Sequence, residues 1–129
     1  MARVLAVALE VMDRPWCWGE ADCCTAACDV FARLHGVDPM APLRGRYHSG
    51  ARAARLIAQW GGWLAMGDGL AERAGLVRVA CGQPGDIGII RDAQGALALG
   101  IRTERGWAGK TRQGMALGHM EMRAWTCRQ

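Results

Sequence analysis

The sequence of 129 residues has four prolines, almost no lysine and no long apolar run. Few prolines beside 18 glycines indicate a chain rich in turns but free of low-complexity segments. A membrane-spanning helix needs roughly 18 consecutive apolar residues, and Glu10 interrupts the apolar N-terminal run before that length. The chain is also too short for two ordinary domains. We therefore predict one domain over residues 1–129, without a signal sequence and without a membrane span.

Positive charge is present, but the sequence contains no basic run. The formal net charge of +4 comes from 16 basic residues, all arginine except Lys110, which are scattered from Arg3 to Arg128. Nucleic-acid-binding surfaces usually combine clustered basic residues with stacking aromatics, so we predict no nucleic-acid partner. Fixed positive charge also suits an anionic polymer such as peptidoglycan, or an acidic partner surface.

The cysteines do not form the pattern of a disulfide framework or of a zinc site. They are Cys17, Cys23, Cys24, Cys28, Cys81 and Cys127. Their lopsided spacing and the absence of a signal sequence disfavour a disulfide scaffold, and the spacing matches no common set of zinc ligands. Cys24 and Cys28 lie four residues apart, which suits the core-facing side of a helix. We expect no metal and no cofactor; a metal- or redox-regulated module is an alternative that rests on cysteine number alone.

Apolar residues recur at helical spacing in the first part of the chain. Residues that cap or stop helices stand beside several of these stretches. The predicted helices cover a short segment around residues 4–11, a central helix over residues 23–35 between Asp22 as N-cap and Gly36 as stop, a helix from the cap Ser49 to Gly61, and a helix from the cap Asp68 to Gly75.

Beyond Leu76 the apolar period changes from helical to two, and turn residues interrupt it at intervals of about eight to twelve. This pattern is typical of an antiparallel meander. The predicted strands are residues 76–80, 86–91, 96–102 and 120–126, with a weaker candidate at 107–110. Helices first and strands second predict an α+β fold, in which N-terminal helices pack on a C-terminal antiparallel sheet.

Cys23 stands out because it falls in the first turn of the predicted central helix. Unpaired backbone N–H groups and the positive end of the helix dipole stabilise a thiolate at such a position. Asp22 opposes this effect unless capping occupies its carboxylate. A small buried residue is the alternative role for Cys23 taken alone.

Two motifs resemble the NlpC-like superfamily, papain-like enzymes that cut cell-wall peptides next to a D-configured residue. Trp18-Gly-Glu-Ala-Asp-Cys23 resembles its Trp-Gly-x-x-Asp-Cys segment, and Pro84-Gly-Asp-Ile-Gly88 resembles the Pro-Gly-Asp-hydrophobic start of its sheet. More closely, the chain resembles a small phage and prophage branch found among tail genes. That resemblance spans most of the chain and rests on Gly36-Val-Asp-Pro39, Arg44-Gly-Arg-Tyr47, Gly61-Gly62, Ala98-Leu-Gly-Ile101 and Ala124-Trp125.

The chain departs from the active members of that superfamily at the residue that would act as base. In active relatives a His-Val-Gly-Ile segment supplies the histidine that accepts the thiol proton; here the segment is Ala98-Leu-Gly-Ile101. Alanine can neither accept that proton nor protonate a leaving amine. Of the remaining histidines, His35 lies about three turns down the helix and His48 suits a solvated or capping role. His119 is the candidate substitute base, with an ordinary surface histidine as the alternative.

Trp18, Asp22 and Tyr47 are the candidate substrate-binding residues besides Cys23. Trp16 and Trp18 suit a groove for glycan or peptide, and Tyr47 with its neighbours Arg44 and Arg46 suits an anion-recognition surface; core packing and a solvated loop are the alternatives.

The resemblance implies a phage tail-tip component that is made in the bacterial cytoplasm and assembled into the virion tail. Its implied partners are other tail-tip proteins and peptidoglycan. We predict a structural or adaptor role with a degenerate catalytic site. The alternative is an active cysteine peptidase or amidase that cleaves peptidoglycan peptides during phage entry, with Cys23 as nucleophile.

Overall fold

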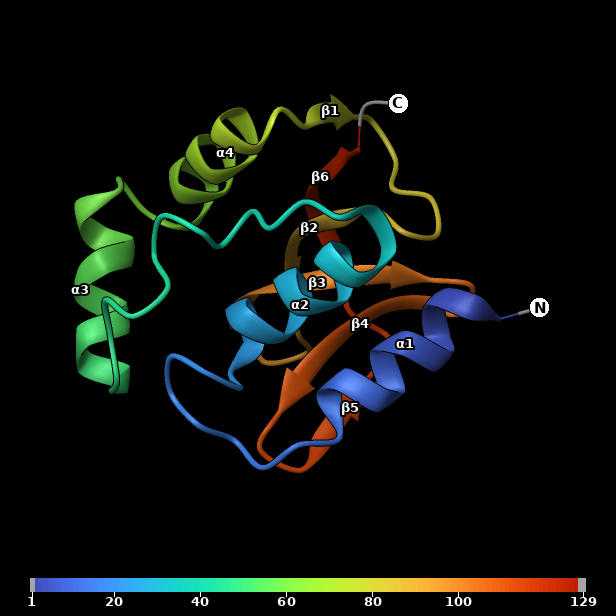
Figure 1. Cartoon of the computed structure of the whole chain (residues 1–129), viewed down its shortest axis with the longest axis horizontal. Coiled ribbons are helices and arrows are strands. Elements are labelled where there is room, and N and C mark those ends of the chain that lie inside the picture. The colour runs from blue at the N-terminus through green and yellow to red at the C-terminus, as the bar shows by residue number, and fades with distance from the viewer. Residues whose placement is uncertain (1, 128–129) are drawn as a thin grey trace.

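The computed structural model describes residues 2–127, and within them four helices precede a six-stranded antiparallel sheet (Figure 1). The predicted α+β class is therefore confirmed. The helices are α1 (Arg3–Met12), α2 (Cys23–His35), α3 (Gly50–Gln59) and α4 (Trp63–Ala74). The strands are β1 (Val77–Val79), β2 (Ile87–Arg91), β3 (Leu97–Thr103), β4 (Gly106–Thr111), β5 (Gly114–Ala116) and β6 (Met120–Thr126).

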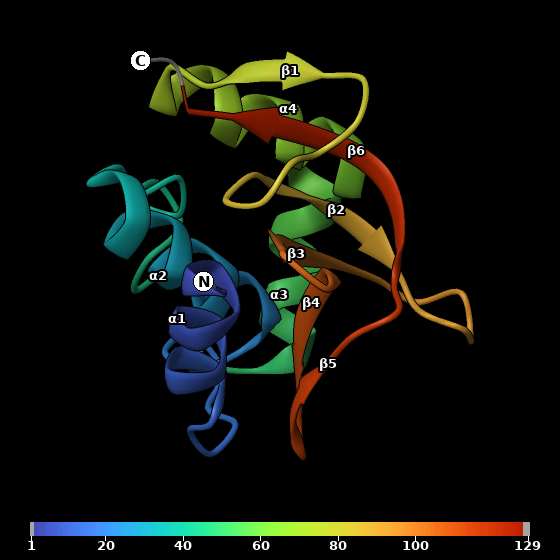
Figure 2. The same cartoon turned by 90° about the vertical axis from the view of Figure 1, so that its right-hand side faces the viewer.

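The sheet has the order β1-β6-β2-β3-β4-β5, so the last strand lies between the first two. Gly88 of β2 has Gly100 of β3 as its partner on one side and Ala124 of β6 on the other. Helices α1 and α2 cover one face of the sheet (Figure 2), whereas α3 stands away from the sheet at the margin of the molecule in Figure 1. Among the residues described, no helix has the length and apolarity to cross a membrane.

Helix α1 is held at both ends by side chains from the strands. At its start the backbone N–H groups of Val4 and Leu5 each donate to the carboxylate of Glu104 over 2.9 Å. At its end Lys110 Nζ donates to the carbonyl oxygen of Met12 over 2.9 Å and also to that of Arg14. Free N–H groups at the start of a helix and free carbonyls at its end need such partners, so the β3–β4–β5 region docks this helix.

Both anchoring groups have shifted pKa values. Desolvation acts to raise the pKa of Glu104, but the N–H groups of Val4 and Leu5 outweigh it and lower the pKa overall. Burial lowers the pKa of Lys110, because an ammonium loses hydration there. Lys110 is only 4% exposed although it is the one lysine of the sequence.

The face of the sheet turned away from the helices carries a second small core. Ile90, Trp107 and Ala124 are buried there as a cluster separate from the main core. Glycine makes this packing possible, since a Cβ on Gly88 would come within 2.8 Å of the Trp107 ring and a Cβ on Gly100 within 2.4 Å of Ile90 Cδ1. Side chains on this face therefore lie on the opposite side of the sheet from α1 and α2.

Two elements differ from the prediction. Helix α4 begins at Trp63, after Gly62 with φ 103°, and not at Asp68. Asp68 lies within the helix and pairs with Arg123 of β6 at 2.6 Å, so this acidic residue is an ion-pair partner and not an N-cap. Strand β5 was not predicted, and the weak candidate at residues 107–110 is the well-formed strand β4.

Candidate thiol site beneath helix α3

A tight turn places Cys23 at the first position of α2. The backbones of Cys17 and Ala21 bond to each other in both directions, at 3.1 and 2.7 Å. Gly19 adopts φ 87°, and a Cβ there would lie 2.2 Å from the carbonyl oxygen of Tyr47. Only glycine fits both the conformation and the contact, which gives the glycine of the Trp-Gly-x-x-Asp-Cys motif a structural reason.

Asp22 is the N-cap of α2, as predicted, and its carboxylate is fully engaged. The side chain is 1% exposed. One oxygen accepts from the backbone N–H of Thr25 at 2.9 Å, and the other accepts from the N–H of Gly19 and the hydroxyl of Tyr47, both at 2.7 Å. Asp22 therefore has no free oxygen with which to take a proton from a neighbouring thiol.

Tyr47 links this turn to the loop that precedes α3. It is 4% exposed, and burial, together with the nearby Cys24 and Asp22, raises the pKa of its hydroxyl far above the ordinary range. The anion-recognition surface expected from Tyr47, Arg44 and Arg46 does not form as such: Tyr47 and Arg44 have partners within the protein, and Arg46 is exposed. Tyr47 donates inward to Asp22, while Arg44 is paired with Asp38 at 2.7 Å and Asp29 at 2.6 Å.

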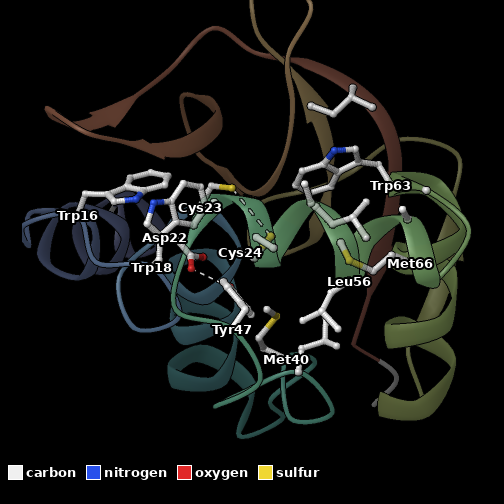
Figure 3. Close-up of a pocket in the computed structure, with 18 residues that line it drawn as sticks. Trp16, Trp18, Asp22, Cys23, Cys24, Met40, Tyr47, Leu56, Trp63 and Met66 are labelled. Atoms are coloured by element: carbon white, nitrogen blue, oxygen red, sulfur yellow. Dashed lines mark hydrogen bonds between the residues drawn. The ribbon is translucent and has the colours of Figure 1, made fainter.

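Cys23 opens onto a cavity of about 570 Å³ beneath α3, which we call the thiol cavity (Figure 3). Its walls come from the loop before α2, the start of α2, the loop before α3, α3 itself, the start of α4 and the first residue of β3. The larger lining side chains are Trp16, Trp18, Met40, Tyr47, Leu56, Trp63, Met66 and Leu97. Asp22 is the one charged group among the described lining residues, and its oxygens are already occupied.

Cys24 supports Cys23 from the core side. The two sulfur atoms lie 3.9 Å apart, and Cys24 is buried whereas Cys23 is partly exposed. Its hydrogen bond with Cys23, followed by burial, raises the pKa of Cys24 well above its usual value. Burial likewise raises the pKa of Cys28. Cys24 and Cys28 thus stay protonated. Both are buried, as predicted for the core-facing side of the helix.

Strand β3 presents Leu97, not Ala98, to the thiol cavity. Leu97 lines the cavity and packs on the main core. Ala98 packs against the second core of Ile90 and Trp107 on the other face of the sheet. Successive side chains of a strand point to opposite faces, so even a histidine at position 98 would point away from Cys23 in this register.

The structure does not bring His119 and Cys23 together. The His119 ring lies against Gly109, where a Cβ would be 3.4 Å from Cε1, and Ile90 contacts the same point. That places His119 on the sheet face with the second core, and its Nδ1 is buried without a hydrogen-bond partner in the described chain. His119 therefore lies outside the thiol cavity.

The other two histidines have structural surroundings. His35 Nε2 is 2.8 Å from the carbonyl oxygen of Gly85, and its ring lies 4.4 Å from that of Phe31. His48 is exposed beside the Gly19 turn but does not line the thiol cavity. No histidine of the described chain lines the cavity.

An aromatic pair forms one end of the thiol cavity. Trp16 and Trp18 pack edge to face with ring centroids 5.0 Å apart, and Trp18 also contacts Gly50 at the start of α3. Sequence analysis missed Arg112 of the β4–β5 turn, whose guanidinium lies 5.1 Å from the Trp16 ring and 5.8 Å from the Trp18 ring. A cation over the two rings holds the pair in place. No local sequence pattern joins position 112 to positions 16 and 18.

The chain matches a family model over nearly its whole length. The family model described as "Domain of unknown function (DUF6950)" matches residues 1–127. No curated protein and no solved structure matches the chain.

Proposed function

We propose that this chain, which belongs to the family described as a domain of unknown function (DUF6950), docks a partner without cutting it. In this proposal the fold is papain-like, of the NlpC type, and the chain is a structural or adaptor component of a phage tail tip. The motif resemblances around Cys23 and Pro84 support the fold, and the segments that resemble the phage and prophage branch support the tail assignment. The observation that carries the non-hydrolytic role is a thiol cavity without a free base among its described lining residues.

Hydrolysis by a cysteine requires a group that accepts the thiol proton and later protonates the leaving amine. Asp22 is saturated by three hydrogen-bond donors. The raised pKa of Cys24 keeps its proton on the sulfur, and Tyr47 directs its hydroxyl proton to Asp22. None of these neighbours can exchange a proton with Cys23 at neutral pH.

The cavity walls suit docking of an apolar group. Three tryptophans and several aliphatic and methionine side chains surround about 570 Å³, a volume in the range of pockets that enclose small apolar ligands or side chains. A partner's aliphatic or aromatic side chain can bury its surface there while Cys23 stays at the mouth.

A blocking substitution on α3 tests docking. Ala54 is exposed and lines the cavity, whereas Ala51 is exposed on the same helix and does not line it. Ala54→Phe should narrow the entrance and lower incorporation of the chain into tails, and Ala51→Phe should leave it unchanged. Cys23→Ser should preserve both incorporation and infectivity. Normal incorporation of Ala54→Phe would contradict docking through this cavity.

An active cysteine peptidase or amidase is the second candidate. It is favoured by the position of Cys23 at the first residue of α2, partly exposed, beside a cap carboxylate that is fully engaged. Mass spectrometry of purified peptidoglycan after incubation with the protein decides between the two. We expect the same fragments with the wild type, with Cys23→Ala and with no protein. New fragments that disappear with Cys23→Ala would overturn the non-hydrolytic role.

A further inference from the structure

The positive charge of the chain is concentrated around α3. Between Asp38 and Asp68 the sequence has no acidic residue, but it contains Arg44, Arg46, Arg52 and Arg55. Four of the 16 basic residues lie there, which leaves 12 basic against 12 acidic in the remainder. The whole formal net charge of +4 thus belongs to this one segment, although no basic run marks it in the sequence.

Three of these arginines have no acidic partner in the described chain. Arg44 is neutralised by Asp29 and Asp38. The ion pairs of the described residues involve none of Arg46, Arg52 and Arg55, and all three side chains are exposed. Arg52 and Arg55 are also three residues apart on α3, so their like charges repel each other. A bound anion would relieve that repulsion.

The three arginines line a continuous depression on the outer side of α3. Arg46, Arg52, Arg55 and Gln59 surround one hollow, and Arg46, His48 and Arg52 surround the next. No carboxylate lines either hollow among the described residues. We call this depression the cationic groove; it follows the helix that stands apart from the sheet in Figure 1.

We propose that the cationic groove docks an acidic peptide segment of a partner protein. A guanidinium presents a planar fork of N–H donors that binds a carboxylate through two hydrogen bonds. Arginines on a helix and on its preceding loop suit carboxylates spaced along an extended chain. Leu56 and Tyr47 line both the groove and the thiol cavity, but none of the three arginines lines the cavity, so binding by the arginines does not depend on what Cys23 does.

The surroundings of the groove favour a peptide over the other large anions. Single-stranded nucleic acids need exposed aromatic rings for stacking, but the one aromatic residue in the groove, Tyr47, is buried. Membrane-binding helices place several large apolar side chains beside the basic ones. Leu56 is the one large aliphatic side chain among the described residues that line the groove, and it also lines the thiol cavity. The exposed large apolar residues lie on other elements of the described chain.

Fluorescence anisotropy with a labelled oligoglutamate peptide tests the proposal. The triple variant Arg46→Gln, Arg52→Gln, Arg55→Gln should bind this peptide about tenfold more weakly than the wild type. The matched control Arg3→Gln, Arg78→Gln, Arg105→Gln removes the same charge from exposed positions elsewhere and should bind within about twofold of the wild type. Cys23→Ser should bind like the wild type.

Each other result would overturn the proposal. An equal loss in the control variant would show that net charge and not the groove attracts the peptide. If the wild type bound an oligoglutamine peptide of the same length as tightly as it binds oligoglutamate, recognition by charge would be excluded. Tighter binding of an oligothymidylate, or of phosphatidylglycerol vesicles, would assign the groove to another class of partner. Failure of the wild type to bind oligoglutamate would remove the proposal and leave docking through the thiol cavity untouched.

Discussion

Helices α1 and α3 have the same length of ten residues, yet the rest of the molecule holds them very differently. Val4, Ala8, Val11 and Met12 of α1 are buried, whereas no residue of α3 is buried in the described structure. Both helices follow from the same kind of apolar spacing. Amphipathic spacing alone therefore does not tell a docked helix from one that forms the wall of a cavity.

The ends of the two helices show the same contrast. Glu104 and Lys110, about a hundred residues distant in sequence, cap α1 at its two ends. Helix α3 is capped at its start by the adjacent Ser49, whose side-chain oxygen accepts from the Arg52 N–H at 3.1 Å. A locally capped and thinly packed element opens at lower free energy than the core. We infer that α1 stabilises the fold and that α3 presents its binding surfaces.

Lys110→Ala should give the largest loss of stability, because it removes α1's C-terminal anchor. The substitution deletes a buried side chain and leaves two carbonyl groups without their donor, so we expect the free energy of unfolding to fall by about 2–4 kcal/mol. Urea denaturation followed by circular dichroism measures this change.

Two further variants sharpen the interpretation of Lys110. Lys110→Met keeps most of the side-chain packing but loses the hydrogen bonds. The difference in free energy of unfolding between Lys110→Met and Lys110→Ala therefore measures packing, and the difference between the wild type and Lys110→Met measures the hydrogen bonds to the two carbonyl groups. Arg105→Gln removes an exposed charge from the β3–β4 turn and should change stability by no more than about 0.5 kcal/mol. If Lys110→Ala were as stable as Arg105→Gln, the anchor would have no energetic role.

Glu104→Gln should have a smaller effect that depends on pH. Its carboxylate binds the N–H groups at the positive end of α1, and losing such a cap costs about 1 kcal/mol at pH 7. Since folding lowers the pKa of Glu104, its contribution is complete above the unfolded value of about 4.3 and is lost as the pH falls through the folded value. Urea denaturation at pH 7 and at pH 3 should show the two proteins converging in acid. If the wild type and Glu104→Gln differed in free energy of unfolding by the same amount at both pH values, a stabilising role for the charge of Glu104 would be excluded.

Local signals were enough to predict the parts of the fold that depend on neighbours in sequence. Asp22 and Ser49 cap α2 and α3 as expected, because an N-cap side chain bonds to a backbone N–H three residues away. Gly36 ends α2 as expected, because glycine readily adopts the left-handed conformation found there. The period of two likewise predicted the principal strands. Asp68 misled the prediction of α4 because its partner, Arg123, lies on β6, 55 residues away.

The site was less predictable for the same reason. The motif placed Cys23 at the start of α2, and the structure agrees. Which side chain of β3 meets the thiol cavity depends on strand register, and a shift of one residue exchanges Leu97 for Ala98. The stacking of Arg112 on the two tryptophans and the gathering of Arg46 with the two arginines of α3 depend on contacts between separate segments. No periodicity encodes such contacts.

Ser49→Ala should have the smallest effect on global stability and should affect α3 alone. Loss of the cap costs α3 about 1 kcal/mol, but a helix without buried residues contributes little to the cooperative unit. In native-state hydrogen exchange the amides of α3 should exchange faster than those of α1 in the wild type. Ser49→Ala should accelerate exchange of the α3 amides about fivefold and leave exchange in α1 unchanged. The global free energy of unfolding should change by less than about 0.5 kcal/mol. Equal acceleration of both helices would show that α3 opens only with the whole fold, and the contrast between the two helices would fail.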